Sequence, residues 1–283
     1  MLYGNFEKKF FYVEKWSWLK YERKENVFLI TSKTNEFIKH VKALHQKKFR
    51  DEYKEYFVEG VKLINEAISE NKEVRKILIC EELLREKFQV PDDDIVEYVA
   101  KNVFEYISDT QSPQGILAII KMNEFKGEVC ENTIFALDDL QDPGNLGTIL
   151  RSLDSAGINT LLLSKDTVDL YNPKVIRSTM GAIFRVKVLE NLDLKEKLIE
   201  LKKLGYKIVI TSLDTNEMHY NLDFSDRLVI VIGNEAKGVK KEIQDLADIK
   251  VKIPMIGRTE SLNASVAASI IAYEKVRQEI CRI

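Results

Sequence analysis

The stretch Leu137–Ser152, LDDLQDPGNLGTILRS, joins an apolar run to a helix through a break at Pro143-Gly144. The run begins at Ile134 and ends in carboxylates, as expected where a buried strand leaves a sheet. Arg151 then follows within the first turns of the next helix. A guanidinium just beyond a glycine-containing turn at a strand end is suited to bidentate binding of an anion. The stretch therefore indicates an α/β unit with a site for negative charge.

Similar apolar runs recur through the second half of the sequence. Most are Val/Ile/Leu segments without alternation, which is typical of parallel strands covered on both faces. We predict strands at Ile134–Asp138, Thr160–Ser164, Val186–Leu189, Lys207–Thr211, Leu228–Ile232 and Ile249–Ile253. Helices fill the gaps, the clearest being Leu194–Leu204 and Asn263–Val276. The fold class is α/β with a parallel sheet.

The first half alternates helices and strands on a smaller scale. Strands are predicted at Tyr53–Val58, Val74–Cys80, Ile95–Val99 and Ile116–Lys121, and helices at Asn35–His45, Val61–Ser69 and Lys101–Ser108. We place a small α/β domain at 31–122, a polar linker at 123–133 and the parallel-sheet domain at 134–283. Residues 1–30 form an aromatic, charged extension, either a packed appendage or an over-long translation start.

Composition narrows the class of protein and its partners. The 283 residues carry a formal net charge of −2, so any basic surface must be local. Thr31–Lys54 holds seven cations and three carboxylates, which fits either phosphate binding or a solvated helix face. The cations are Lys33, Lys39, Lys42, Lys47, Lys48, Arg50 and Lys54, and the carboxylates are Glu36, Asp51 and Glu52.

Cysteine and histidine usage indicates a cytoplasmic protein without a metal site. Cys80, Cys130 and Cys281 lie far apart with no CxxC pair, which fits reduced structural thiols. With only three histidines, a zinc site is not expected. No run approaches the roughly 18 apolar residues of a transmembrane helix, so we expect no membrane partner.

Two more loops follow predicted strands, at the position where open α/β sheets bind ligands. VIGNEAKGV (231–239) brackets Glu235 with Gly233 and Gly238, and VKIPMIGRTESLNASVAAS (251–269) opens a helix after Ser261-Leu262-Asn263. Each loop also has an ordinary explanation in turn chemistry, helix capping by Ser261 or a tightly packed alanine-rich helix.

Two nucleotide-binding motifs are excluded. Residues 233–238 keep the Gly-x4-Gly spacing of a phosphate-binding loop, but Val239-Lys240 stand where Lys-Ser/Thr is required. No G-x-G-x-x-G follows a strand, so a dinucleotide fingerprint is also missing. A nucleotide-phosphate enzyme is therefore disfavoured.

Together the three loops resemble a known family. Asn145-x-Gly147-x-x-x-Arg151, Gly233-x-Glu235-x-x-Gly238, and Ile253-Pro254-Met255 with Ser261-Leu262-Asn263 resemble, in order and spacing, the three motifs of the SpoU (TrmH-like) branch of the SPOUT RNA methyltransferases. The resemblance covers about 134–276. The 31–122 region, with FVEGVKLINEA (57–67), is similar to the ribosomal-protein-like RNA-binding domain often fused in front.

The resemblance implies a C-terminal trefoil-knotted parallel-sheet domain, a homodimer, and S-adenosylmethionine (AdoMet)-dependent methylation of a ribose 2′-hydroxyl in structured RNA. Ribosomal RNA is favoured over transfer RNA because of the ribosomal-protein-like front domain. The alternatives are a transfer RNA 2′-O-methyltransferase and a non-catalytic RNA-binding or assembly factor with the same fold.

The resemblance also assigns roles to residues. It implies that Gly233, Ile253 and Leu262 contact the cofactor and that Arg151 is catalytic, with Asn145, Glu235, Ser261 and Asn263 as the polar motif positions. A guanidinium with a pKa above about 12 rarely gives up its proton, so we expect Arg151 to orient phosphate and stabilise charge. Glu235 could instead form an ion pair with Arg151.

Overall fold

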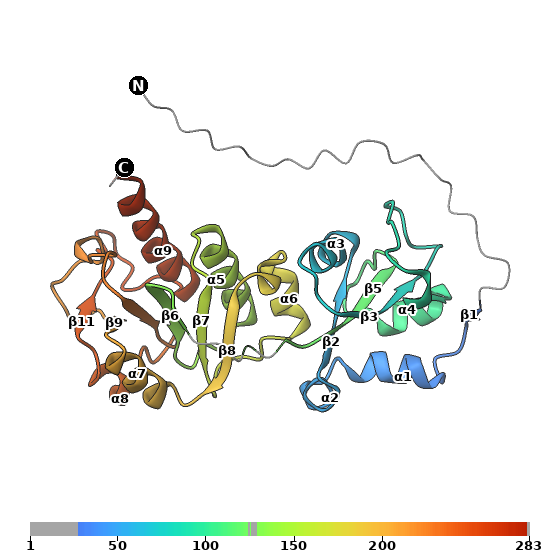
Figure 1. Ribbon diagram of the computed structural model, residues 1–283, viewed down its shortest axis with the longest axis horizontal. Coiled ribbons are helices and arrows are strands. Elements are labelled where there is room, and N and C mark those ends of the chain that lie inside the picture. The colour runs from blue at the N-terminus through green and yellow to red at the C-terminus, as the bar shows by residue number, and fades with distance from the viewer. Residues whose placement is uncertain (1–27, 124, 126–128, 282–283) are drawn as a thin grey trace, which may run out of the picture.

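The computed structural model describes residues 28–123, 125 and 129–281, which form two α/β units, each built on one sheet, that lie side by side (Figure 1). Residues 1–27 of the predicted extension, and 124 and 126–128 of the predicted linker, lie outside the described residues. Leu29–Ile30, predicted to be in the extension, instead form strand β1, because their backbone pairs in parallel with Tyr98 and Val99.

The first sheet has the order β1-β4-β3-β5-β2. Its strands are β1, β4 (Val96–Val99), β3 (Val74–Ile79), β5 (Ile116–Lys121) and β2 (Glu55–Glu59). Strand β5 runs antiparallel to both β3 and β2, and five of its six residues are buried. Helices α1 (Glu36–Ala43) and α4 (Lys101–Ile107) share a core with one face of the sheet, and α3 (Val61–Ser69) packs on the other. The result is a three-layer α/β unit.

The second sheet has the order β11-β9-β10-β6-β7-β8, and all its pairings are parallel. Its strands are β6 (Thr133–Leu137), β7 (Thr160–Ser164), β8 (Lys187–Leu192), β9 (Lys207–Thr211), β10 (Leu228–Ile232) and β11 (Ile249–Val251). All residues of β6, β7 and β10 are buried, as their unbroken apolar runs predicted. The predicted α/β fold with a parallel sheet is confirmed.

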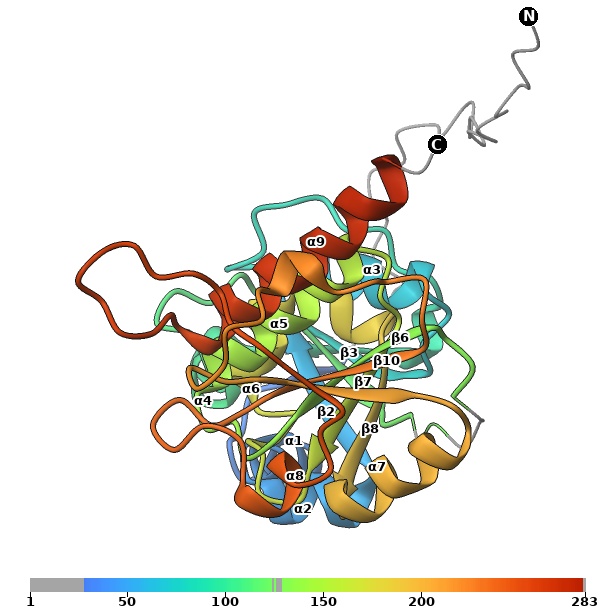
Figure 2. The same ribbon diagram turned by 90° about the vertical axis from the view of Figure 1, so that its left-hand side faces the viewer.

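Helices cover both faces of the second sheet. One face packs against α5 (Pro143–Ser155), α6 (Pro173–Thr179) and α9 (Ala264–Cys281), and the other against α7 (Leu194–Lys203) and α8 (Lys241–Gln244). Three short 3₁₀ turns, η1 (Asp93–Ile95), η2 (Ala182–Phe184) and η3 (His219–Asn221), complete the structure. Figure 2 shows the chain leaving β11 as a long loop before it enters α9.

Strand β11 is shorter than predicted. It ends at Val251 rather than Ile253, because Lys252 forms only an isolated bridge with Met218 and Pro254 has no N–H to continue the ladder. Ile253 therefore lies in the loop that follows the strand.

Helix α5 starts as its sequence dictates. The Asp142 side chain accepts a hydrogen bond from the Asn145 backbone N–H at 2.8 Å, and Pro143 occupies the first turn, where its missing N–H costs nothing. Gly147 allows α6 to pack closely, since a Cβ there would lie 2.3 Å from Cβ of Ser178. The α5–α6 contact therefore depends on this glycine.

The two units meet through buried and ionic contacts. Arg50, on α2 (Lys47–Tyr53), is only 3% exposed; it donates to the Leu44 carbonyl at 2.7 Å and pairs with Asp169 in the loop after β7. The rings of Tyr56 and Tyr171 lie 4.6 Å apart across the same junction. The sequence left Arg50 as either a phosphate-binding or a solvated cation, and both interpretations are wrong for this residue because its guanidinium is buried and paired with Asp169.

Within residues 28–123, 125 and 129–281, no helix combines the length and apolarity needed to cross a bilayer. The same residues contain no group of three or more His, Cys, Asp or Glu side chains arranged to hold a metal ion.

We expect Arg50→Met to lower the free energy of unfolding by about 3 kcal/mol, because removing one partner of a buried ion pair leaves the other charge uncompensated. Urea denaturation followed by circular dichroism measures the change. The control is Arg75→Met: this arginine is 47% exposed, pairs with Glu73 at 2.8 Å, and should contribute less than about 1 kcal/mol. Equal effects of the two substitutions would contradict a buried tie at the junction.

Candidate active site at the carboxyl edge of the parallel sheet

The three predicted loops meet at one edge of the second sheet. Strand β10 pairs with β6 on one side and with β9 on the other, and β9 pairs with β11. Since all four strands are parallel, the loops that follow β6, β10 and β11 leave the sheet at the same end. Residues far apart in the sequence can therefore contact one another there.

Side chains from the three loops form a continuous hydrogen-bond network. Asn145 donates through Nδ2 to Oε1 of Glu235 at 3.0 Å, and its Oδ1 accepts from Nδ2 of Asn263 at 2.9 Å. Glu235 also accepts from the backbone N–H groups of Gln141 and Asp142, at 3.4 and 3.3 Å. We call Glu235, Asn145 and Asn263 the three-loop network, because each comes from a different motif.

The three-loop network keeps Glu235 ionised. Partial burial would raise the pKa of this carboxyl group, but the hydrogen bonds from Asn145 and from the backbone outweigh burial and lower the pKa below its ordinary value. At neutral pH the side chain is therefore a carboxylate that accepts hydrogen bonds only. The stabilisation it provides is lost as the pH falls through that lowered pKa.

Asn263, rather than Ser261, caps helix α9. Its Oδ1 accepts from the backbone N–H and the hydroxyl of Ser265, at 2.9 and 2.6 Å, and from the Val266 N–H at 3.4 Å. The suggestion that Ser261 is the helix cap is therefore wrong, because α9 begins at Ala264. Ser261 lines the cavity instead.

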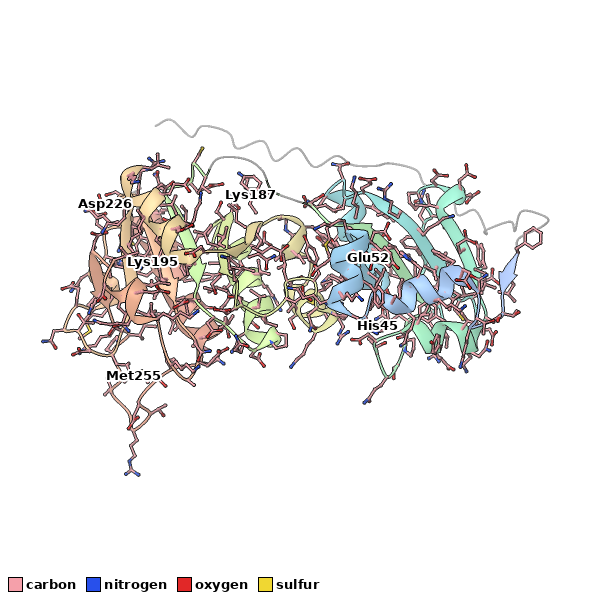
Figure 3. The ribbon with its side chains drawn as sticks, turned by 90° about the horizontal axis from the view of Figure 1, so that it is seen from below. His45, Glu52, Lys187, Lys195, Asp226 and Met255 are labelled. Carbon is pink, nitrogen blue, oxygen red and sulfur yellow. The ribbon has the colours of Figure 1, made fainter. Side chains whose placement is uncertain are left out.

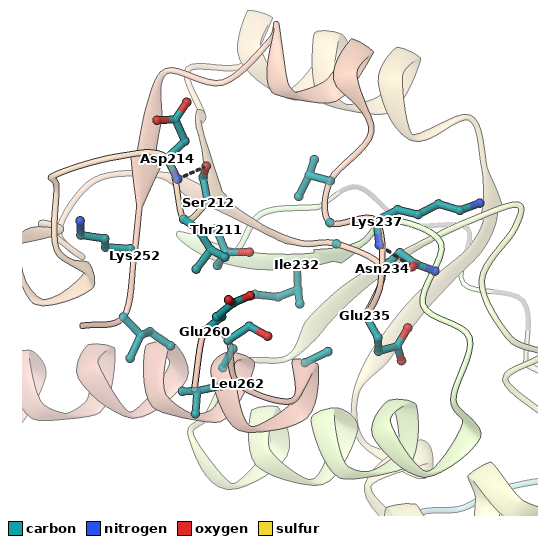
Figure 4. A pocket seen from close by; sticks show the side chains of 18 of the residues that line it. Thr211, Ser212, Asp214, Ile232, Asn234, Glu235, Lys237, Lys252, Glu260 and Leu262 are labelled. Carbon is teal, nitrogen blue, oxygen red and sulfur yellow. Dashed lines mark hydrogen bonds between the residues drawn. The ribbon is translucent and has the colours of Figure 1, made fainter. Parts of the chain in front are cut away.

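A cavity of about 580 Å³ lies beside the three-loop network (Figure 4). Its volume falls within the range typical of small-molecule sites. Apolar side chains form part of its wall, and charged groups of both signs form the rest. The apolar part includes Ile232, Val251, Ile253, Leu262 and Ala264, and the charged part includes Asp214, Glu235, Lys237, Lys252 and Glu260.

Gly233 shapes the cavity. It follows β10 directly, and a Cβ at this position would lie 2.2 Å from the Gly238 carbonyl carbon and 2.3 Å from the Val239 nitrogen. No side chain fits there unless the backbone moves. Both Gly233 and Gly238 line the cavity, so the glycine lets the 233–238 loop close on itself and present its backbone to a ligand.

Asn234 holds the same loop in shape and was not predicted. Its backbone pairs in both directions with Gly238, and its Oδ1 accepts from the N–H groups of Ala236 and Lys237 at 2.9 and 3.0 Å (Figure 4). Its Nδ2 donates to the Asp139 carbonyl at 2.8 Å, which ties the loop after β10 to the loop after β6. An asparagine before a short turn favours this local bonding, so the residue type could have indicated the role.

The residues after β9 had no motif to indicate them. Thr211, the last residue of β9, lines the cavity together with Ser212, Leu213 and Asp214, although this strand end carries no glycine or proline motif. Strand β9 was predicted, and its carboxyl end lies at the same edge as the three motif loops. That shared edge was the only signal available.

The predicted site residues lie in three places: the cavity lining, the three-loop network and the exposed surface of α5. Gly233, Glu235, Ile253, Ser261 and Leu262 line the cavity, whereas Asn145 and Asn263 lie behind Glu235 in the three-loop network. Arg151 is exposed on α5 and does not line the cavity.

Arg151 is not the partner of Glu235. Over the described part of the chain, its guanidinium makes no ion pair or hydrogen bond, and the Glu235 carboxylate is engaged by Asn145 and the backbone. The suggested Glu235–Arg151 ion pair is therefore wrong. The guanidinium is left available for an external anion.

An α/β unit with a mixed apolar and charged cavity at the carboxyl edge of its parallel sheet defines a site for a small cofactor. The chain belongs to the SpoU rRNA methylase family: the family model matches residues 132–273. A second model, the MRM3-like substrate binding domain, matches residues 35–118. The family inferred from three motifs is confirmed, and with it the prediction of a methyltransferase.

Similar proteins span nearly the whole chain. A curated relative, the 23S rRNA (guanosine(2553)-2'-O)-methyltransferase RlmP of Bacillus subtilis (strain 168), is 33% identical over 248 residues, covering 86% of this chain and 97% of its own. An AdoMet-bound rRNA methyltransferase from Sinorhizobium meliloti is 29% identical, with a TM-score of 0.77 over 89% of this chain and 98% of that one.

The SpoU methyltransferase AviRb from Streptomyces viridochromogenes, in complex with the cofactor AdoMet, is 27% identical. Its TM-score is 0.76, over 87% of this chain and 98% of that one. The likeness to both solved structures therefore includes the first sheet as well as the second.

We expect Gly233→Ala to weaken AdoMet binding at least about tenfold, because the added methyl group must displace the Gly238–Val239 backbone. Isothermal titration calorimetry measures the affinity. Gly257→Ala is the matched control, since a Cβ at Gly257 has no atom within 4 Å. Circular dichroism must show that both variants are folded. Unchanged affinity in a folded Gly233→Ala protein would remove this loop from the binding site.

Proposed function

We propose that this protein transfers a methyl group from AdoMet to a ribose 2′-hydroxyl of ribosomal RNA. The observation that carries the proposal is the cavity bounded by Gly233, Ile253 and Leu262 with the three-loop network beside it. These are the motif positions to which the family resemblance assigns cofactor contact and catalysis. The B. subtilis relative, named as a 23S rRNA 2′-O-methyltransferase, supports ribosomal RNA as the substrate class.

The residues that line the cavity fit AdoMet. Ile232, Ile253 and Leu262 offer an apolar wall for adenine, and the closed 233–238 loop offers backbone groups to the ribose and base. Three carboxylates and two ammonium groups in the same wall suit a zwitterionic amino acid attached to a positive sulfur. When bound, AdoMet supplies an electrophilic methyl group whose leaving group is a neutral thioether.

The chain's own residues would position the ribose 2′-hydroxyl and stabilise the negative charge that develops on its oxygen. As the 2′-oxygen bonds to the methyl carbon, the carbon–sulfur bond would break to leave the neutral thioether, and the hydroxyl proton would pass to water. Arg151, exposed and without an ionic partner among the described residues, would bind a phosphate next to the target ribose and stabilise the developing negative oxygen. Ser261 and the amides of Asn145 and Asn263 would orient the nucleotide and the loops.

Two other functions are less well supported. A transfer RNA substrate would use the same chemistry, and relatives named tRNA/rRNA methyltransferases also cover most of this chain. Ribosomal RNA is preferred because the B. subtilis relative, which is named for a single RNA, is named for 23S rRNA. A non-catalytic RNA-binding factor would not need Glu235, Asn145 and Asn263 in one hydrogen-bond network, yet all three are present and bonded.

Further features of the proposal concern assembly and location. The exposed side chains of Val266, Tyr273 and Ile280 recur every seven residues along α9 and so lie along one face, which supports a homodimer contact there. We propose the C-terminal trefoil knot from the family resemblance. We place the protein in the cytoplasm by likeness to its bacterial relative.

The domain roles complete the proposal. Residues 31–122 would bind RNA, in line with the match to a substrate binding domain, and 134–283 would carry the methyl transfer, with 123–133 as the linker. For residues 1–27 of the extension we propose no role.

We expect Arg151→Ala to bind AdoMet normally but to transfer methyl groups about 10²–10³-fold more slowly, as found when one donor aimed at developing charge is removed. Single-turnover transfer of labelled methyl groups to deproteinised 23S rRNA measures the rate. Arg151→Lys keeps the charge but loses the planar fork, so it should restore little activity.

The matched control is Arg75→Ala, an exposed arginine on the first sheet, which should transfer at the wild-type rate. Near-normal transfer by Arg151→Ala at saturating RNA and cofactor would exclude Arg151 from the mechanism. A wild-type protein that binds AdoMet but methylates no RNA would contradict the proposed function.

A further inference from the structure

The outer surface of the first unit carries lysines that lack ionic partners. Lys33, Lys47 and Lys48 are exposed and Lys42 is half-buried. Among the residues that the structure describes, none of the four makes an ion pair. Neighbouring cations differ: Lys39 pairs with Glu36 at 2.7 Å, and Arg50 is buried against Asp169. Lys47 interacts electrostatically with Glu190, but no carboxylate among the described residues lies at ion-pair distance from any of the four ammonium groups. These lysines are therefore available for an external anion.

Aromatic rings lie among these lysines. The ammonium groups of Lys33 and Lys42 lie 5.3 and 5.1 Å from the ring centroid of Tyr106 on α4, and that ring remains 38% exposed. On α2, Tyr53 is 40% exposed and lies 4.6 Å from the ring of His40 on α1. These contacts join α4, α1 and α2 into one area, the α1–α2 surface, made of Lys33, Lys42, Lys47, Lys48, Tyr53 and Tyr106.

Charge is distributed unevenly over the first unit. Residues 81–97 contain seven carboxylates and two cations, the reverse of the lysine-rich 31–54 segment. A polyanion would therefore be attracted to α1 and α2 and repelled from the 81–97 segment. The overall charge of −2 conceals this separation.

The α1–α2 surface begins at the edge of the catalytic sheet. Helix α2 is held by the Arg50–Asp169 pair to the loop after β7. The neighbouring Val168 donates its N–H to the Leu140 carbonyl at 2.8 Å, in the loop after β6 that precedes Asn145. Figure 3 shows the two units side by side, with Glu52 of α2 and Met255 beside the cavity in different halves of the molecule.

We propose that the α1–α2 surface binds a segment of the substrate RNA away from the methylated nucleotide, with the lysines on phosphates and Tyr53 and Tyr106 against unpaired bases. Lysines on a backbone path with exposed aromatic rings between them are the arrangement that binds unpaired nucleic acid. An acidic protein partner would use the lysines but would not need the rings. The proposal rests on the proposed function.

The test replaces Lys33, Lys42, Lys47 and Lys48 together by glutamine. Filter binding to deproteinised 23S rRNA over a series of KCl concentrations should show affinity at least about tenfold weaker. The salt dependence should become shallower by about 0.7 for each phosphate that the variant no longer neutralises. AdoMet affinity and turnover at saturating RNA should be unchanged, while KM for RNA rises. Replacing the same four lysines by arginine should preserve binding.

A matched control removes four lysines that already pair with carboxylates. Lys→Gln at all four should lower the net charge equally but leave RNA affinity near that of the wild type, because these lysines lie outside the α1–α2 surface and already pair with carboxylates. The four are Lys76, Lys187, Lys195 and Lys207, paired with Glu97, Glu131, Glu242 and Asp226 at 2.7, 2.9, 3.6 and 2.6 Å.

The aromatic half of the proposal has its own variants. Tyr53→Ala and Tyr106→Ala should each weaken RNA binding about tenfold without changing the salt dependence, since stacking releases no counterions. Tyr53→Phe and Tyr106→Phe keep the ring and should bind as the wild type does.

The outcomes separate this surface from the proposed function. If the wild type methylates 23S rRNA and the four-glutamine variant keeps its affinity and salt dependence, the α1–α2 surface is not an RNA site. If the four-glutamine variant and the control variant weaken RNA binding equally, the proposal is also overturned. The loss of affinity would then result from the change in net charge and not from this surface. If the wild type methylates no RNA, the proposed function itself fails.

Discussion

The hydrogen bonds that Asn145 makes on both sides of its amide are the interaction on which the site depends. Its Nδ2 reaches the Glu235 carboxylate and its Oδ1 receives Asn263, so one side chain joins the loops that follow β6, β10 and β11. Hydrogen bonds to a charged acceptor are stronger than neutral ones, and this carboxylate also receives the N–H groups of Gln141 and Asp142. Three loops from separate parts of the sequence are thereby fixed with respect to one another.

A second set of contacts, made by Asp138 and Asn234, also holds the loop after β10 in place. Asp138, at the end of β6, is 1% exposed and accepts the Lys240 N–H at 2.7 Å. Burial raises the pKa of this carboxyl group, while the Lys240 hydrogen bond opposes that rise. Asn234 closes the turn between Gly233 and Gly238. The cavity is therefore held in shape by the buried Asp138 carboxylate, which lies outside its lining, and by Asn234 within its own wall, which limits the reorganisation needed when a ligand binds.

The sequence predicted those features that depend on local pattern. Unbroken apolar runs identified the parallel strands, and the Pro143 turn identified the start of α5. The same reasoning missed contacts between distant segments. Arg50 lies among lysines in the sequence, but its guanidinium is buried against Asp169, 119 positions away. Motif spacing correctly predicted that Glu235 lies in the loop after β10, but it could not predict where the carboxylate points. Arg151 was therefore a plausible partner, although the actual partner is Asn145.

The proposed function requires that this edge of the sheet methylates a ribose oxygen and not a base. Its most direct test is to incubate the purified protein with AdoMet and deproteinised 23S rRNA, digest the RNA to nucleosides and identify the methylated product by mass spectrometry. We expect one 2′-O-methylnucleoside, with the added mass on the ribose. A methyl group on a base, or AdoMet binding without methylation of any RNA, would contradict it.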